Sequence, residues 1–340
     1  MRLIKTTSIS LALAVKLPRV ISKWWLILSR ANRSGSVISS LKSRGFTMIE
    51  LIISSALSVI ILASMTIILT KTIWIVEEVK AASEIVENAQ FLTKLISREL
   101  KLAGFYGGFY KQRNSSLLAP DICDSVDKKY IQRAVPFSIV TINNVGKELR
   151  ACGGELVRAA SDILLIRRSL VSKQIPPTGL NKEKFYVQVA PDGFEADRGD
   201  KPEAFILQLN GQTAPVRVWQ QTIYYVSKDN VFKRRRFMNG QYSRSEPLAQ
   251  GVDDFQVEFS VKMPGGCNSS QSFSTPVSQV QHQQITAVRF YLLLRSSGQG
   301  ANQAGKQFRY ADTEKNVAIN DGGHYALFSA IVPIMNSALK

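Results

Sequence analysis

The sequence predicts an α+β protein in which one long N-terminal helix packs on an antiparallel β-sheet. The helix follows from the stretch between Phe46 and Ala103, which contains neither glycine nor proline over 58 residues, the two strongest helix breakers. The sheet follows from the later chain, where short β-branched and aromatic segments alternate with Gly, Asn, Asp and Pro. These patterns divide the chain into a basic leader (1–45), a transmembrane half-helix (46–70), an amphipathic half-helix (71–103) and a β-rich domain (104–340).

The positive charge is concentrated at the start of the chain. The net charge is +17, and residues 1–45 hold nine Lys and Arg without a single acid, so +17 − 9 leaves +8 for residues 46–340. Basic flanks of membrane helices stay in the cytoplasm. We therefore expect the leader inside and the residues beyond about position 70 outside, an orientation signal rather than a nucleic-acid site. The leader is either a long cytoplasmic segment or an upstream extension from an early start site.

The apolar run from Phe46 to Thr70 has the length of a membrane span, which needs about 20 apolar residues. A buried core helix rarely continues so far without a polar face. A secretory signal peptide has a shorter apolar core and a cleavage site after it, whereas here the candidate processing feature precedes the run. The sequence therefore favours a single membrane-spanning helix.

The second half of the predicted helix becomes amphipathic. Charged residues occupy its other faces, and Gly104 with Gly107-Gly108 should end it. An apolar stripe at helical spacing needs a surface to cover, which we expect to be the sheet. The stripe consists of Ile75, Val79, Ala82, Val86, Ala89, Leu92, Ile96 and Leu100.

Seven segments after the helix read as strands, and 222–237 reads as a hairpin that turns at 228–230. Two polar stretches, 265–284 and 296–306, read as loops. The predicted strands are 161–169, 184–190, 203–210, 222–227, 230–237, 253–261 and 285–296.

Three cysteines, Cys123, Cys152 and Cys267, follow the apolar run on the side expected to be outside, where disulfides are reasonable. Three single pairings are possible, each leaving one thiol. We favour Cys123–Cys152, which closes a local loop. No Cys/His spacing indicates a metal site.

Other candidate sites have ordinary structural interpretations. The basic run Lys233–Arg236 could bind phosphates, but alternate side chains of a strand point to opposite faces, so we interpret it as a solvated hairpin strand. The tripeptide Arg198-Gly199-Asp200 fits a turn. Asp253-Asp254 lacks the spacing of a calcium loop. His282 and His324 lie far apart with no ligand cluster, and no catalytic triad motif or P-loop is present. We expect no enzyme activity, no cofactor and no metal.

The stretch RGFTMIEL resembles the class III signal of type IV prepilins at Gly45, Phe46 and Glu50. The resemblance implies that a prepilin peptidase removes the leader by cutting between Gly45 and Phe46, and methylates the new Phe46 amine. Glu50 would be costly in lipid as an unpaired charge. It becomes tolerable by pairing with the amine of Phe46, its own or a neighbour's, which would favour axial register between subunits. The alternative is an acid at the lipid interface without a partner.

Later blocks are similar to the PilW-type minor pilins. They include RELKLAGFYGG, GVDDFQVEFSV with ITAVRFYLLLRS, and the ending HYALFSAIVPIMNSALK. The resemblance implies a pilin-like fold and a minor pilin that primes type IV pilus assembly and supports motility or adhesion. The chain would cross the inner membrane once, with a cytoplasmic N-terminus and a periplasmic C-terminal domain, before entering the fibre. Its partners would be other minor pilins, the major pilin, the prepilin peptidase and the inner-membrane assembly platform.

Two other readings share parts of the pattern. A minor pseudopilin of a type II secretion system would carry the same signal and helix. A DNA- or surface-binding tip module would need a basic patch that survives folding, and we consider nucleic-acid binding the weaker expectation. An anchored enzyme has no catalytic constellation to support it.

Overall fold

The computed structural model describes residues 45–108, 119–171, 175–191, 193–261, 273, 285–296, 305–311, 316–318 and 323–336. The chain divides into two units, one up to Thr66 and the other from Ile67 onward. One long helix, α2 (Met48–Leu102), contributes to both. Its 55 residues confirm the helix predicted from the absence of glycine and proline.

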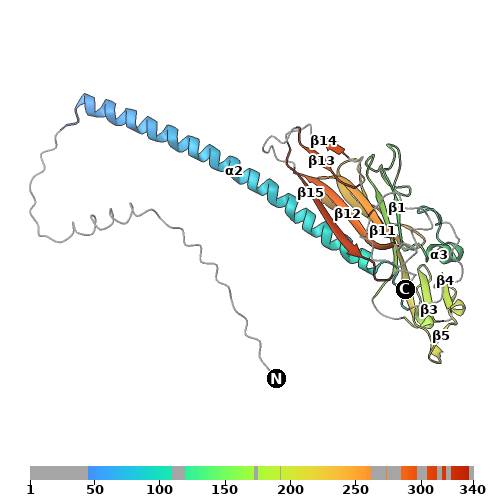
Figure 1. Ribbon diagram of the computed structural model, residues 1–340. Helices are drawn as coiled ribbons and strands as arrows, with labels where there is room; N and C mark the ends of the chain where they lie inside the picture. Colours follow the sequence, from blue (N-terminus) through green and yellow to red (C-terminus); the bar gives the residue numbers. More distant parts are fainter. Residues whose placement is uncertain are drawn as a thin grey trace, which may run out of the picture. The chain divides into compact units, whose positions relative to one another are not determined.

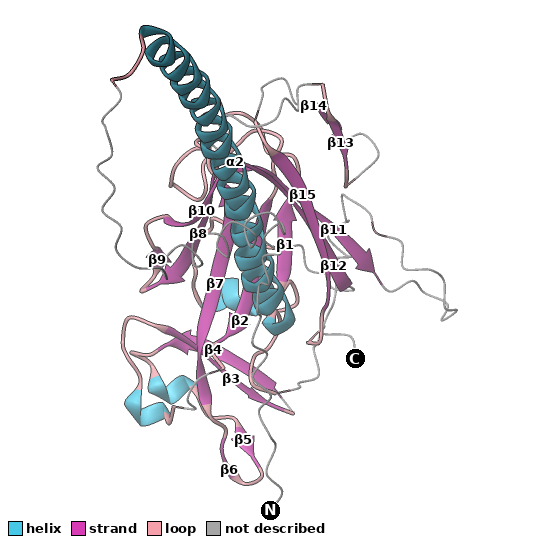
Figure 2. Ribbon diagram, turned by 90° about the vertical axis from the view of Figure 1, so that its left-hand side faces the viewer, coloured by secondary structure: helices cyan, strands magenta, loops and turns pink. Residues whose placement is uncertain are grey.

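The second unit is built from antiparallel sheets (Figures 1 and 2). Eight strands of the described chain form the larger sheet. Five of them follow the order β1-β2-β7-β3-β4; β8 pairs with β7, and both β9 and β10 pair with β8. A second sheet has the order β11-β12-β15, and β5–β6 and β13–β14 form two small pairs. The larger sheet comprises β1 (Ile139–Ile142), β2 (Ile163–Ser169), β3 (Phe185–Ala190), β4 (Gly193–Arg198), β7 (Val216–Val226), β8 (Val231–Met238), β9 (Gln241–Tyr242) and β10 (Glu246–Gln250). The remaining elements are α3 (Lys128–Ala134), the 3-10 turns η1 (Pro177–Gly179) and η2 (Pro202–Ala204), β5 (Gln208–Leu209), β6 (Gln212–Thr213), β11 (Val252–Val261), β12 (Ile285–Arg295), β13 (Gln307–Arg309), β14 (Asn316–Ala318) and β15 (Tyr325–Pro333).

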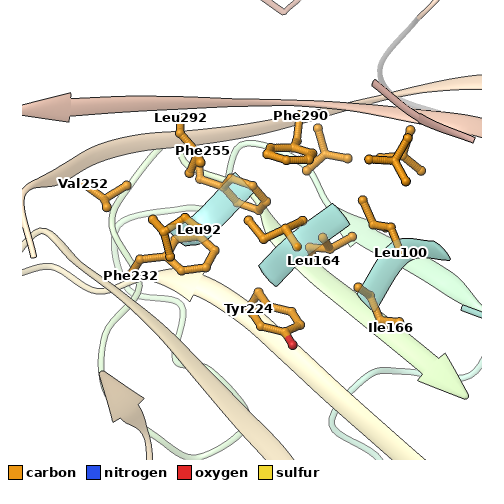
Figure 3. Packing of buried hydrophobic residues seen from close by; sticks show 14 of the residues in the cluster. Leu92, Leu100, Leu164, Ile166, Tyr224, Phe232, Val252, Phe255, Phe290 and Leu292 are labelled. Atoms are coloured by element: carbon orange, nitrogen blue, oxygen red, sulfur yellow. The ribbon is translucent and has the colours of Figure 1, made fainter. Parts of the chain in front are cut away.

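The second half of α2 packs into the main hydrophobic core, as the fold prediction requires. Leu92, Ile96 and Leu100 are fully buried. Their cluster includes Leu164 of β2 and Phe290 of β12, so the helix contacts both sheets (Figure 3). Burying one such side chain contributes roughly 1.5–3 kcal/mol, so this face of α2 holds the second unit together.

The predicted apolar stripe is right from Ala89 onward and wrong before it. The buried residues upstream are Ala81 and Ile85 rather than Ala82 and Val86. Adjacent apolar pairs at 81–82 and 85–86 allow either face, so helical periodicity alone could not choose between them. Val86 therefore remains exposed, together with Ile75 and Val79.

Most predicted strands and the hairpin are confirmed. The β7–β8 hairpin turns at 228–230, where Asn230 adopts a φ of 60°. The strand predicted at 203–210 is wrong, because η2 precedes an irregular segment and only Gln208–Leu209 pairs as β5. The carbonyl of Leu207 instead accepts hydrogen bonds from the Gln188 side chain and the backbone of Ala214. The loops predicted at 265–284 and 296–306 lie almost wholly outside the described residues.

Gly104 follows the end of α2 in a left-handed conformation with a φ of 75°. A Cβ atom there would lie 2.5 Å from the carbonyl oxygen of Asn336, closer than any side chain tolerates. The Gly104 N–H donates to the carbonyl of Arg167 at 3.0 Å. This glycine therefore lets the helix end and the chain turn directly onto β2.

Candidate functional site

The candidate processing site lies just before α2. Gly45 is not helical, and none of the described residues lies within 4 Å of the position that a Cβ would occupy. The next residue, Phe46, is 81% exposed. The fold of this segment therefore does not itself require a glycine at position 45, and a need for glycine there would come from an enzyme that binds the backbone closely.

Thr47 and Glu50 cap the N-terminus of α2. Oε2 of Glu50 accepts hydrogen bonds from the Thr47 backbone N–H at 3.1 Å and from its hydroxyl at 3.0 Å. The Glu50 N–H donates to the Thr47 hydroxyl oxygen at 3.3 Å. This reciprocal arrangement is a capping box, whose signature is Thr followed three residues later by Glu. The reading of Glu50 as an acid without a partner is therefore wrong, and the spacing that reveals its partner was present in the sequence.

The apolar part of α2 has the properties of a membrane span. By length and composition the described chain has one helix able to cross a membrane, and every residue from 48 to 66 is exposed. Four of its hydroxyl side chains are satisfied locally, because they donate to backbone carbonyls three or four residues earlier. These donors are Ser55, Ser58, Ser64 and Thr66. Such bonds make hydroxyls tolerable where no water is available.

An ion pair joins the membrane-distal half of the helix to the larger sheet. The guanidinium of Arg168 on β2 donates to both carboxylate oxygens of Glu99, at 2.9 and 3.1 Å. The Arg168 side chain is 10% exposed and the Glu99 side chain 16%. A bidentate pair of this kind fixes orientation as well as proximity, so it sets the position of α2 along β2.

The neighbouring Arg167 anchors the opposite side of β2, a role that the sequence analysis missed. Its side chain is fully buried and donates to Gln221, to the carbonyl of Phe137 and to the hydroxyl of Tyr130 on α3. In the sequence, Arg167-Arg168 reads only as two alternating faces of a strand, and no local signal distinguishes a buried arginine from a solvated one.

The basic run on β8 is not a free phosphate-binding surface. The predicted strand is confirmed. It is solvated only in part, because the side chain of Arg236 is 40% exposed whereas Lys233 and Arg234 are 15% and 19% exposed, and all four cations have protein partners. Hydrogen bonds from Arg234, followed by the pairing of Arg236, lower the pKa of Glu246 to about 2. The pairs are Lys233 with Glu155, Arg234 and Arg236 with Glu246, and Arg235 with the carbonyls of Ala151, Cys152 and Ser243.

The remaining candidates have structural roles where they are described. Arg198 forms an ion pair with Asp200 at 3.8 Å, and a Cβ on Gly199 would meet the Asn181 carbonyl oxygen at 2.2 Å, so the close approach of these two backbone segments requires a glycine. Asp253 pairs with Arg158 at 2.7 Å, and Asp254 accepts from the N–H of Phe255. No group of three potential metal ligands occurs among the described residues. His324 directly precedes β15, and His282 lies outside the described residues.

A disulfide joins Cys123 to Cys152, with their Cα atoms 4.9 Å apart and a sequence separation of 29. It ties the segment before α3 to the turn that supports Arg235 of β8. Cys267 lies outside the described residues.

Comparisons with known proteins give two family-model matches and one similar structure. Residues 223–336 match the family model of the Type IV Pilus-assembly protein W, PilW. Residues 40–66 match the Prokaryotic N-terminal methylation motif, which spans Gly45, Phe46 and Glu50. A type IV-like pilin from Thermus thermophilus is similar in structure, with a TM-score of 0.39 and 11% identity over 74% of this chain and 97% of that one. No curated protein sequence matches. The chain thus carries a region that matches the PilW family model at residues 223–336 and a prokaryotic N-terminal methylation motif at residues 40–66.

Proposed function

We propose that a prepilin peptidase cleaves this chain between Gly45 and Phe46 and methylates the Phe46 amine. The mature chain then acts as a minor pilin that primes type IV pilus assembly and supports motility or adhesion. The single observation that carries the proposal is the methylation motif at the start of a 55-residue helix, in a chain whose residues 223–336 match the PilW model. The role is mechanical rather than catalytic.

The location follows from the same features. Residues 46–70 anchor the chain in the inner membrane, the basic leader 1–45 stays in the cytoplasm, and residues 104–340 fold in the periplasm. The partners are other minor pilins, the major pilin and the inner-membrane assembly platform. Extraction from the membrane needs a motor in another protein, since this chain has no P-loop.

Glu50 changes partner in this scheme. Before cleavage its carboxylate is held by Thr47. Cleavage creates a positive amine on Phe46, one residue further toward the N-terminus. A charge-assisted bond to an ammonium is stronger than one to a neutral hydroxyl. The carboxylate is therefore available to a Phe46 amine, from its own chain or a neighbour, while the Glu50 N–H still donates to the Thr47 hydroxyl.

The test is the N-terminal mass of the protein recovered from membranes and from sheared fibres, in hosts with and without the peptidase. We expect a chain beginning at N-methyl-Phe46 only where the peptidase is present. A chain that retains the leader in both hosts would overturn the proposal. Recovery of the mature chain from membranes but never from sheared pili would favour a pseudopilin of a secretion system.

A further inference from the structure

One edge of β7 is shared by two strands that do not meet. β7 pairs with β3 as far as Val218 and with β8 from Thr222 onward. β2 pairs with β7 along 219–224 and therefore lies on the edge opposite β8. The chain after β2 stays on that edge, because the Leu170 N–H donates to the Val218 carbonyl at 2.9 Å, and this places β3 on the same edge as β8. Within the described chain, residues 219–221 thus face an interval between β3 and β8 where no strand pairs with them.

A pocket of about 150 Å³ lies at this interval. Trp219 and Gln220 both line it, although neighbouring side chains of a strand point to opposite faces, because a break between two strands opens the sheet to both faces. Phe185 of β3 and Phe237 of β8 also line the pocket, and their ring centroids are 5.9 Å apart. A cavity of about this volume with apolar walls holds one benzene ring. The pocket therefore has the size and the lining for a single aromatic ring.

Two buried polar atoms of the pocket residues are unpaired. The indole Nε1 of Trp219 and the amide Oε1 of Gln220 have no hydrogen-bond partner among the described residues, and Trp219 is only 3% exposed. Buried polar groups are nearly always paired, so such atoms call for a partner. The indole only donates and the amide oxygen only accepts, and a hydroxyl group complements both. Met238, which also lines the pocket, is 51% exposed, and a flexible methionine adapts readily to a ligand.

The pocket lining also carries a surplus of positive charge. Lys184 and Arg236 both line it. No ion pair between described residues includes Lys184. Arg236 shares the carboxylate of Glu246 with Arg234, so two guanidinium groups there meet one acid. A carboxylate on the ligand would complement these cations.

We infer that this pocket binds a small aromatic carboxylate that carries a hydroxyl group on its ring. The ring packs against the two phenylalanines, and the hydroxyl accepts from the Trp219 indole and donates to the Gln220 amide oxygen. The carboxylate pairs with Lys184 and Arg236. Small-molecule sites commonly combine apolar walls with a few convergent polar groups in this way. This binding activity is separate from the proposed role in pilus assembly.

The test is a titration of the full-length chain, in non-ionic detergent and with tryptophan labelled by ¹⁵N in the indole ring. The chain has four tryptophans, and the signal missing from Trp219→Phe identifies the indole of Trp219. We expect 4-hydroxybenzoate to shift this signal saturably, with a dissociation constant of about 1 mM or below for a ligand of this size. The indole of Trp74, outside the pocket, should not move.

Two related probes separate the parts of the ligand. Benzoate lacks the hydroxyl and should bind about tenfold more weakly, because it leaves buried polar atoms unpaired. Phenol lacks the carboxylate, so its affinity should not depend on salt, whereas high salt should weaken the binding of 4-hydroxybenzoate.

Variants assign these effects to single side chains. Gln220→Leu should weaken 4-hydroxybenzoate about tenfold and leave benzoate unchanged, because only the hydroxyl needs the amide oxygen. Lys184→Ala should weaken both carboxylates and leave phenol unchanged. The matched control is Lys182→Ala, which removes the same charge from an exposed lysine outside the pocket lining and should have no effect. Melting temperatures show that each variant is folded, which matters most for Trp219→Phe because that side chain stacks on Tyr106.

The inference is overturned if 4-hydroxybenzoate produces no saturable shift of the Trp219 signal or binds no tighter than benzoate. Equal weakening by Lys184→Ala and Lys182→Ala would also overturn it. The pocket shares no residue with the leader or the methylation motif, so this outcome is independent of whether the peptidase cleaves at Gly45.

Discussion

Truncation of Ile96 to alanine tests how the long helix is held by the sheets. Ile96 is fully buried in the main core, whereas Ile75 on the same helix is 55% exposed. Isoleucine-to-alanine changes in cores cost about 2–5 kcal/mol. In a domain of this size about 3 kcal/mol lowers the melting temperature by roughly 6–12 °C. Ile75→Ala should stay within about 0.5 kcal/mol of wild type.

The assay is thermal and urea unfolding of the full chain in detergent at high salt. Tryptophan fluorescence and near-UV circular dichroism monitor the unfolding transition. The two variants remove the same atoms from the same helix, so their difference isolates burial. Equal destabilisation by both, or a wild-type melting temperature for Ile96→Ala, would refute the packing of α2 described above.

Three further predictions concern the cap, the disulfide and pH. Thr47→Ala removes both hydroxyl contacts of the capping box and should cost about 1 kcal/mol locally, measured as faster amide exchange at Glu50 with no change in the melting temperature of the second unit. Cys123→Ser opens a loop of 29 residues closed by Cys152 and should lower stability by about 3–4 kcal/mol on loop entropy, an effect that reduction of wild type must reproduce. The folded pKa of Glu246 is about 2, below its ordinary value of 4.5, so its contribution is present above pH 4.5 and is lost as pH falls toward 2. Glu246→Gln should therefore reduce the loss of unfolding free energy as the pH falls from 4.5 toward 2. An unchanged dependence of the unfolding free energy on pH in this range would contradict the pairing of Glu246 with Arg234 and Arg236.

The helix could be predicted from the sequence because its signals are local. The absence of glycine and proline from Phe46 to Ala103, and the glycine at position 104, fix its extent to within two residues at each end. The hairpin was predictable for the same reason, since its turn residues lie between two β-branched segments. The N-terminal methylation motif is recognised from the sequence of residues 40–66 alone, without any tertiary contact.

What the sequence left open depends on contacts between distant residues. The choice between Ala81–Ile85 and Ala82–Val86 as the buried face is made by packing against distant residues of the main core, to which Ile85 belongs, and not by helical spacing. The cations of β8 look solvated in sequence because their partners, Glu155 and Glu246, come from other segments. The strand predicted at 203–210 failed because the side chain of Gln188 on a neighbouring strand competes for the backbone there.

The way α2 is seated on the second unit has a mechanical consequence. If the membrane end of the helix is drawn along its axis, the load falls in shear on Leu92, Ile96, Leu100 and the Glu99–Arg168 pair together. These contacts lie side by side along the pulling direction and must yield almost at once, whereas a load across the axis would peel them apart singly. Forced unfolding is governed by the height of the unfolding barrier rather than by equilibrium stability. The packing of α2 on the second unit is thus most resistant to force along the helix axis, the direction in which a growing fibre would pull.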